Sequence, residues 1–282
     1  MVVITDSTVD LPRTLIEKYG IEVVPLRIQI GQDSYRDYFE IDVDKFYYRL
    51  RSTKEFPRTT QPSPQDFIHV YKKALEKSDC LFSIHISSKL SGTYQSAMIA
   101  RQQFLNKRIH VIDSRQTSVG LGLIVLAVAE AVNAGKGETE LLEFIEKMVN
   151  EVKTYFSVDS LEYLNRGGRI GKAQAFLGTM LKIKPLLTLR MGEVYPVEKI
   201  RGRQKLLRRM SEIVKNAAAL HKVRIGLIYT DNEEELSLLN KYLGAVENIE
   251  VVYRGKAGGV ITSHVGPGTI GFSFYPSTLI LT

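Results

Sequence analysis

The chain has 282 residues, of which 44% are hydrophobic and 24% are charged, and its formal net charge is +7. This balance excludes a disordered or low-complexity chain, and the length predicts about two domains. The single cysteine excludes an internal disulfide framework and favours a reducing compartment, so we expect a cytoplasmic protein. No signal peptide is expected at the start. The most apolar run, residues 119–129, is shorter than the ~20 residues that span a bilayer, so we also expect no membrane anchor.

The first half of the chain alternates strand-like and helix-like patterns. Apolar, β-branched segments predict strands at residues 2–5, 23–30, 80–86 and 109–112. Helical spacing predicts helices near residues 11–19, 43–50, 64–75, 94–104, 118–134 and 139–152. This alternation predicts an α/β domain over residues 1–153, with a mostly parallel, Rossmann-like sheet and helices on both of its faces. In such sheets ligands bind beyond the carboxyl ends of the strands.

The second half, residues 154–282, changes character and predicts a smaller α+β domain with a mixed sheet. Two strand-like segments, residues 185–189 and 194–197, flank Met191-Gly192 in the pattern of a hairpin. A basic helix follows the hairpin. The remaining predicted elements are strands at 223–229 and 249–253, a helix near 233–243, and a glycine-rich, strand-like end through Phe272 and 279–281.

The positive charge is concentrated in one segment. Residues 166–224 hold fifteen Lys and Arg against three Glu, a balance of +12, so the rest of the chain carries −5. Such a distribution predicts a surface for an anionic partner, although residues 203–209 also fit a solvated helix face. Nucleic-acid binding through residues 166–224 remains an alternative. The single RGGR at residues 166–169 is no RGG tract and no recognition-helix signature is present, so we expect no nucleic-acid partner.

Metal and nucleotide sites are not predicted. The histidines do not pair with one another or with Cys80 at ligand spacing; they are His69, His85, His110, His221 and His264. Residues 266–271 match G-x-G-x-x-G, but no helix and no acidic residue follow at the required spacing, so we expect a turn there. We therefore expect no metal and no nucleotide cofactor.

Hydroxyl groups in the predicted loops allow two further readings. Ser91-Gly92-Thr93 could begin a helix and present hydroxyl and N–H groups to an anion. With His85 or His264 as a base, Ser91 could serve a hydrolase or acyl-transfer enzyme, although no G-x-S-x-G elbow is present. The neutral donors of residues 59–61, of residues 91–93 and of His264 instead suit a bound carboxylate, because hydrogen bonds to a charged acceptor are the stronger kind.

An ordered set of short motifs runs through both halves of the chain. The motifs are Thr5-Asp6-Ser7-Thr8, Thr59-Thr60-Gln61-Pro62-Ser63, Ser87-Ser88-x-Leu90-Ser91-Gly92-Thr93, Gly167-Gly168-Arg169-Ile170, Leu181-Lys182-Ile183-Lys184-Pro185 and Gly266-Pro267-Gly268-x-Ile270-Gly271. Together they resemble the DegV family of bacterial fatty-acid-binding proteins. Each motif is weak alone, whereas the ordered set over nearly the whole chain is specific.

The resemblance implies a carrier without catalysis of its own. Family members hold one long-chain fatty acid, such as palmitate, between their two domains. The carboxylate would be held by Thr59 and Ser91, with Thr60, Gly92 and His264 beside them; the family often has Ser where this chain has Thr60. The resemblance also implies a separate ATP-dependent fatty acid kinase as partner, which makes the acyl phosphate. Arg169, Arg201 and His264 would then lie near the pocket mouth and face that partner.

Overall fold

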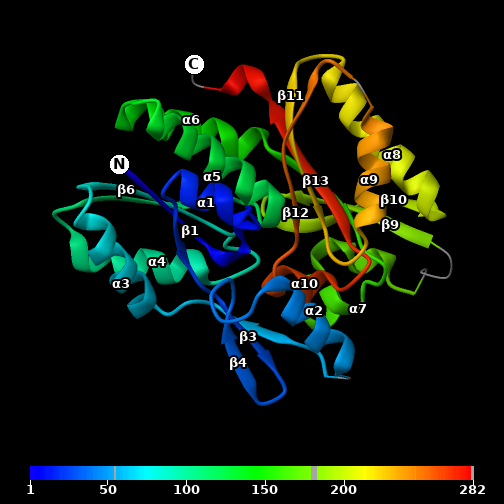
Figure 1. The fold of residues 1–282 in the computed structure, drawn as a ribbon, viewed down its shortest axis with the longest axis horizontal. Helices are drawn as coiled ribbons and strands as arrows, with labels where there is room; N and C mark the ends of the chain where they lie inside the picture. The colour runs from blue at the N-terminus through cyan, green and yellow to red at the C-terminus, as the bar shows by residue number, and fades with distance from the viewer. Residues whose placement is uncertain (54, 179–182, 245, 281–282) are drawn as a thin grey trace.

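Three β-sheets organise the molecule (Figure 1), across the residues that the computed structural model describes, 1–53, 55–178, 183–244 and 246–280. The first sheet is parallel, with strand order β2-β1-β6-β7. Its strands are β1 (Val2–Asp6), β2 (Glu22–Val24), β6 (Cys80–His85) and β7 (Arg108–Asp113).

Helices cover both faces of the parallel sheet, as the sequence predicts for this α/β fold. One face packs on α1 (Arg13–Lys18), α5 (Ser118–Asn133) and α6 (Glu138–Glu151). The other face packs on α3 (Pro64–Leu75) and α4 (Thr93–Arg101), which is followed by the short 3-10 helix η2 (Gln102–Phe104). Ser63 and Asp66 form a reciprocal capping box at the start of α3, which explains why this helix begins where it does.

The second sheet is mixed, as expected, with strand order β10-β9-β8-β13-β11-β12. Only the pair β11 and β12 is parallel within the described residues. The strands are β8 (Lys153–Ser157), β9 (Ile183–Arg190), β10 (Glu193–Arg201), β11 (Val223–Tyr229), β12 (Ile249–Lys256) and β13 (Ile270–Pro276). The predicted hairpin is confirmed as β9 and β10. The basic helix α8 (Arg203–Ala218) and α9 (Glu233–Leu243) cover one face of this sheet.

The third sheet corrects the predicted strand at residues 23–30. That segment is two strands in two sheets, because Pro25 lacks the N–H that a continuous ladder needs. The first part is β2, and the second is β3 (Arg27–Ile30), which pairs with β4 (Asp33–Arg36) and β5 (Arg58–Thr60). Together with α2 (Val43–Ser52) this small sheet packs against Val260 of α10 (Gly259–Val265).

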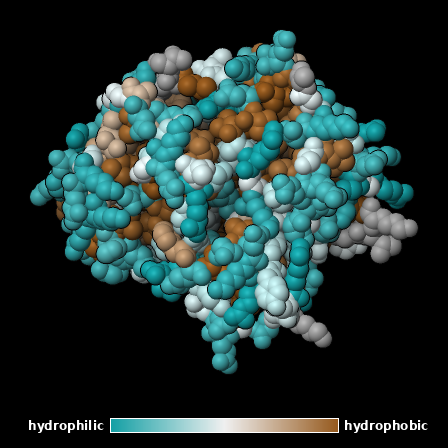
Figure 2. Space-filling view, viewed as in Figure 1, coloured by the Kyte–Doolittle hydropathy of each residue, from teal (hydrophilic) through white to brown (hydrophobic). Residues whose placement is uncertain are grey.

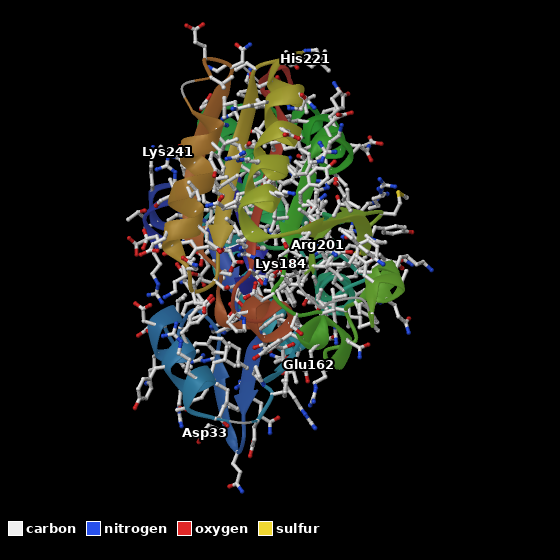
Figure 3. The ribbon with its side chains drawn as sticks, turned by 90° about the vertical axis from the view of Figure 1, so that its right-hand side faces the viewer. Asp33, Glu162, Lys184, Arg201, His221 and Lys241 are labelled. Atoms are coloured by element: carbon white, nitrogen blue, oxygen red, sulfur yellow. The ribbon has the colours of Figure 1, made fainter. Side chains whose placement is uncertain are left out.

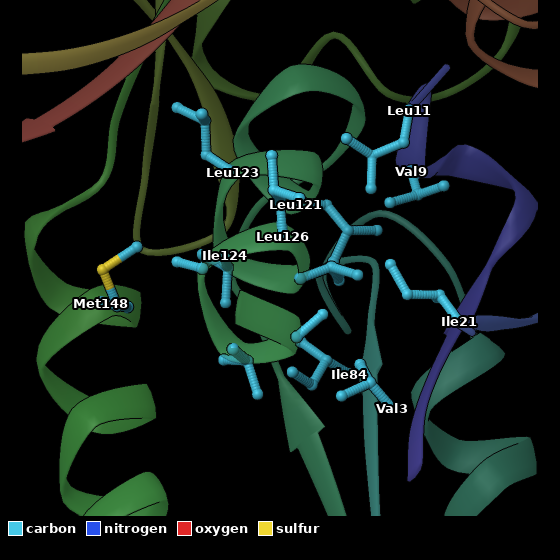
Figure 4. Packing of buried hydrophobic residues seen from close by; sticks show 14 of the residues in the cluster. Val3, Val9, Leu11, Ile21, Ile84, Leu121, Leu123, Ile124, Leu126 and Met148 are labelled. Carbon is cyan, nitrogen blue, oxygen red and sulfur yellow. The ribbon is translucent and has the colours of Figure 1, made fainter. Parts of the chain in front are cut away.

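Helix α5 lies at the centre of the molecule, between the parallel sheet and the mixed sheet. The helix is apolar on all sides, and such a helix is stable only when it is buried all round. Its side chains Leu121 and Leu126 pack in one cluster with Val3 and Ile84 of the parallel sheet (Figure 4), and Tyr253 of the mixed sheet belongs to the same cluster. The predicted buried helix at residues 118–134 is therefore confirmed.

The end of the described chain differs from the prediction. Residues 277–279 form the 3-10 helix η4 (Ser277–Leu279) rather than a strand, and residue 281 lies outside the described residues. The remaining short helices are η1 (Ser7–Val9), α7 (Glu162–Arg166) and η3 (Gly171–Phe176).

Between β7 and β8 the chain passes from the parallel sheet to the mixed sheet, and a domain boundary at residue 153 stays a prediction. Hydrophilic side chains cover most of the face seen in Figure 2. Among the described helices, none combines the length and the apolar character that crossing a membrane requires.

Candidate ligand-binding site

A cavity of about 390 Å³ lies between the parallel sheet and the mixed sheet. Its wall includes Leu26, which follows β2, and Ile86, which follows β6, so the cavity lies beyond the carboxyl ends of these strands, where parallel sheets bind their ligands. Much of its wall is apolar and comes from both halves of the chain: Ile86, Val119, Phe156, Leu189, Ile228 and Val260. A wall of this kind excludes water and favours an apolar ligand.

Thr59 of β5 and His264 of α10 meet in the cavity wall. The Thr59 hydroxyl and the Nε2 atom of His264 are 2.7 Å apart, although 205 residues separate them in sequence. Burial, and to a smaller extent the charge of Arg169, lowers the pKa of His264 to about 4, so the imidazole is neutral at pH 7. The Nδ1 atom of His264 is buried and has no hydrogen-bond partner among the described residues.

Glycine at position 167 makes room for that imidazole. A Cβ atom on Gly167 would lie 2.3 Å from Nδ1 of His264, far closer than van der Waals contact allows. The glycine pair of the Gly167-Gly168-Arg169 motif therefore lets the α7 end approach the histidine. Arg169 follows directly and also lines the cavity. Its guanidinium donates to the carbonyl oxygens of Leu90 and Gly167, which holds the side chain at this place.

The loop between β6 and α4 carries Ser91 into the cavity wall. The loop is held by the buried carboxylate of Asp6, which accepts hydrogen bonds from the Ile86 N–H at 2.9 Å and from Thr8. The Ser87 hydroxyl donates to the Gly192 carbonyl of the hairpin at 2.8 Å. Ser91 itself lies 2.9 Å from the Thr93 hydroxyl. The motif residues that begin the chain thus position the loop rather than the ligand.

Gly92 acts through Gln61, another residue of the cavity wall. A Cβ atom on Gly92 would lie 2.1 Å from the side-chain oxygen of Gln61, so only glycine leaves that amide its present place. The Gln61 amide in turn donates to the Ser96 hydroxyl at 3.3 Å. Gly92 is therefore adjacent to the cavity and shapes it, while Gln61 supplies the polar group.

The structure brings most of the predicted site residues together, but not all. Thr59, Thr60, Ser91, His264 and Arg169 line the cavity. Arg201 does not belong to its lining; it ends β10, opposite Ile183 in the hairpin register, and Figure 3 shows it close to Lys184. Of the motif at residues 181–185, Leu181 and Lys182 lie outside the described residues.

Sequence reasoning missed Thr117, which precedes α5. Its hydroxyl makes no helix-capping hydrogen bond, is buried without a partner among the described residues, and belongs to the cavity wall. A threonine before an apolar helix is usually a cap, so the sequence holds no signal for this difference. The neighbouring Thr154 hydroxyl is fully paired instead, with Gln116 at 2.7 Å and with Ser273 at 2.6 Å.

The geometry does not supply a base for Ser91. His85 is fully buried between Asp6 and Ser83, and His264 pairs with Thr59. Neither imidazole hydrogen-bonds to Ser91 within the described part of the chain, so the hydrolase alternative gains no support. The glycine motif at 266–271 forms a turn after α10, with Gly266 and Gly268 at positive φ, as the sequence analysis expects.

Six of the fifteen Lys and Arg residues in segment 166–224 form ion pairs among the described residues. The cations with acidic partners inside the chain are Arg166, Lys184, Arg203, Arg209, Lys222 and Arg224. These ion pairs reduce the surface that an anionic polymer could use, so nucleic-acid binding gains no support either.

The fold is therefore an α/β protein whose cavity joins an apolar wall to neutral hydroxyl and imidazole groups, which is the chemistry of a site for a small amphipathic molecule. The chain belongs to the DegV family: the family model described as "Uncharacterised protein, DegV family" matches residues 1–277. A DegV domain-containing protein of Caldanaerobacter subterraneus is 39% identical over 273 residues, which cover 96% of this chain and 97% of the relative.

Solved structures of the family share the fold over nearly the whole chain. A fatty-acid-binding DegV family protein from Thermus thermophilus is 40% identical, with a TM-score of 0.92 and coverage of 98% of this chain and 99% of that one. DegV from Bacillus subtilis, a fatty-acid-binding protein, is 31% identical, with a TM-score of 0.89 and 98% coverage of both chains. A stearic-acid-binding protein from Eubacterium ventriosum is 25% identical, with a TM-score of 0.91 and full coverage of both chains.

Proposed function

We propose that this protein binds one long-chain fatty acid in the cavity between its parallel sheet and its mixed sheet. One observation carries the proposal: a single cavity joins a long apolar wall to the Thr59–His264 pair and to Ser91. An amphipathic acid satisfies both parts at once, because its chain covers the apolar wall and its carboxylate accepts the hydrogen bonds. The fatty-acid binding of the relatives from T. thermophilus and B. subtilis supports the same ligand class.

Burial of the acyl chain supplies most of the affinity. Palmitate has about 14 methylene groups, and at ~0.8 kcal/mol each their burial contributes roughly 11 kcal/mol. Lost translational and rotational freedom costs several kcal/mol of this gain. The hydroxyl groups of Thr59 and Ser91 mainly orient the carboxylate.

The Thr59–His264 pair has the polarity that a carboxylate needs. With its proton on Nε2, the neutral imidazole donates to the Thr59 oxygen, and the Thr59 hydroxyl is then free to donate to the ligand. The Nδ1 lone pair faces the Gly167 backbone and needs no donor from the ligand. Arg169 adds positive charge near the same end of the cavity.

We also propose that the protein is a cytoplasmic carrier that presents the bound acid to a separate ATP-dependent kinase. A polar cleft of about 900 Å³ shares Thr59, Arg169 and His264 with the cavity, and Arg58 and Arg166 line it as well. This cleft offers a phosphoryl donor a cationic approach to the carboxylate. Arg169 would act at the cavity, and Arg201, which lies outside the lining, would act only through docking.

The proposal is tested by ligand extraction and by two variants. The purified protein should release a fatty acid into organic solvent, and palmitate should raise the melting temperature of delipidated protein. Thr59→Val and Ser91→Ala should each weaken palmitate binding by roughly 1.5–3 kcal/mol, about 10- to 150-fold, because each removes a donor to a charged acceptor. Thr139→Val, on the exposed side of α6, is the matched control and should bind as wild type does.

Two results would contradict parts of this picture. Wild-type palmitate affinity in both variants would place the carboxylate elsewhere in the cavity. An esterase activity that Ser91→Ala abolishes would make the protein a hydrolase rather than a carrier. For the kinase, Arg201→Ala should slow acyl-phosphate formation more at low than at physiological salt, where screening already weakens the lost attraction, and should leave palmitate affinity unchanged. Arg169→Ala should slow the same step and also weaken palmitate binding, because Arg169 lines the cavity.

A further inference from the structure

Three potential metal ligands meet far from the cavity, at the edge of the parallel sheet. Cys80 begins β6, His110 lies in β7, and Glu138 is the first residue of α6. Their ligand atoms all lie within 4.8 Å of one another. None of the three belongs to the lining of the fatty-acid cavity.

The strand register explains why the side chains converge. Cys80 is paired with Arg108 and Phe82 with His110, so alternate residues of both strands face the same side of the sheet. On that side the His110 ring stacks on Phe82, with ring centroids 5.2 Å apart. Cys80 and Phe82 pack in one cluster with residues of α6, which carries Glu138 to the same place.

The three groups differ in burial in a way that suits ion entry. Cys80 is 2% exposed, whereas the side chains of His110 and Glu138 are 26% and 25% exposed. An ion can therefore reach His110 and Glu138 from solvent and meet the thiol behind them. The Glu138 carboxylate pairs with both His110 and Arg108.

Arg108 orients the carboxylate without occupying both of its oxygens. Its guanidinium lies 2.5 Å from Oε2 of Glu138, while Oε1 faces Nε2 of His110 at 2.7 Å. A residue that binds a metal ligand from the side away from the ion, as Arg108 does here, commonly fixes the orientation of that ligand. One carboxylate oxygen, one imidazole nitrogen and one sulfur are thereby left around a common point.

We propose that Cys80, His110 and Glu138 bind a Zn²⁺ ion that ties α6 to β6 and to the edge strand β7 of the parallel sheet. Sulfur, nitrogen and carboxylate oxygen bind zinc at about 2.0–2.3 Å in a tetrahedron, so ligand atoms roughly 3.5 Å apart are needed. The three ligand atoms already lie within 4.8 Å of one another, and the ion would draw them closer. Hard ions such as Mg²⁺ and Ca²⁺ prefer oxygen alone and are disfavoured by the thiol. Water fills the fourth position.

Binding exchanges protons but no electrons. The Sγ–H bond of Cys80 breaks, its proton leaves to solvent, and an Sγ–Zn bond forms. Zinc replaces the hydrogen bond between His110 and Glu138 by one bond to each residue. The Nε2–H bond of His110 breaks and its proton leaves to solvent, while Nδ1 takes up a proton from solvent, so the imidazole stays neutral and this exchange releases no net proton. A cysteine thiol is mostly protonated at neutral pH, so Cys80 holds its proton until the ion arrives.

Titration of the full-length, untagged protein with Zn²⁺ and with Co²⁺ tests the site. We expect one ion per chain, release of about one proton, and a thiolate-to-Co²⁺ charge-transfer absorption. Cys80→Ser should abolish that absorption and the proton release. Cys80→Ser and His110→Gln should each weaken Zn²⁺ binding at least about 10-fold. His69→Ala and His221→Ala remove exposed histidines elsewhere and should bind as wild type does.

His110→Gln still tests the site if Cys80→Ser disturbs the core, because His110 is partly exposed. In wild type, Zn²⁺ should raise the melting temperature relative to protein in EDTA, and His110→Gln should lose this shift. Zinc binding that both variants retain, or a cobalt complex without thiolate absorption, would overturn the proposal. Palmitate affinity should be the same with and without zinc, so this result stands apart from the proposed lipid function.

Discussion

The two ends of β11 meet the first half of the chain in opposite ways. Arg224, near the start of the strand, is buried, and its guanidinium bonds to Glu130 of α5, to Glu250 and to the Tyr275 hydroxyl. Tyr229, at the other end, lines the cavity, where His264 and Thr117 each keep a buried polar atom without a partner in the described structure.

The difference separates polar groups that are paired within the protein from polar groups of the cavity wall that are not. Buried polar atoms are nearly always hydrogen-bonded, because an unpaired one costs about 1–3 kcal/mol. The cluster around Arg224 meets that rule within the protein and ties α5 to the mixed sheet. At the cavity end the unpaired Thr117 hydroxyl marks a place that a ligand or water could complete.

Arg224→Met should give the largest loss of stability. The substitution keeps the apolar stem but leaves Glu130 and the Tyr275 hydroxyl without their partner, so we expect the free energy of unfolding to fall by about 3 kcal/mol. Urea denaturation measures this change. Lys222→Met removes an exposed cation that also pairs with Glu250 and should cost less than about 1 kcal/mol. An equal loss of unfolding free energy in both variants would show that the buried cation contributes no more to stability than the exposed one.

Two buried carboxyls beside α10, which line a second hollow rather than the cavity, should make stability depend on pH, unlike the cluster held by arginine. Asp10 accepts a hydrogen bond from the Gly258 N–H beside α10, and burial raises the pKa of both Asp10 and Asp37 from 3.8 to about 7. Between these pKa values the folded protein binds more protons than the unfolded chain. The contribution of the two carboxyls to the free energy of unfolding is therefore fully present below about pH 4 and is lost as the pH rises toward 7. His264 acts in the opposite sense, because its lowered pKa costs stability as pH falls from 6.5 toward 4.

The two carboxyls outnumber the histidine, so the unfolding free energy should fall by roughly 1 kcal/mol per pH unit between pH 5 and 7. Chemical denaturation across this range measures the slope. Asp37→Asn keeps the neutral shape and should flatten the curve. Asp44→Asn, at an exposed carboxylate, should leave it unchanged. A wild-type curve that rises over the same range would contradict the burial of two protonated acids.

The smallest effects should come from two threonines of the cavity wall. Thr154→Val breaks the bonds to Gln116 and Ser273 and should lower the stability of the ligand-free protein by about 1.5 kcal/mol. Thr117→Val removes an unpaired hydroxyl and should raise stability by about 0.5 kcal/mol, since no bond is lost. Thermal melts of delipidated protein compare the two. If Thr117→Val were as harmful as Thr154→Val, the Thr117 hydroxyl would have a partner.

Local patterns in the sequence determined the element types and the family. The uniformly apolar run of α5 requires burial on all sides, the alternation of strands and helices predicts a parallel sheet, and Met191-Gly192 marks the hairpin. These features depend on periodicity and turn chemistry over a few residues. The ordered motifs likewise identified the DegV family, because they need no knowledge of distance.

Only the tertiary structure decided which distant residues meet. Thr59 and His264 pair across 205 residues, Arg169 reaches the cavity while Arg201 does not, and the third sheet takes β3 away from β2. Metal ligands are recognised in a sequence by short, regular spacings. Cys80, His110 and Glu138 are far apart in sequence, so the sequence analysis did not identify them as a cluster. Such contacts follow from strand register and helix packing, which sum many weak interactions over the whole chain and leave no local pattern.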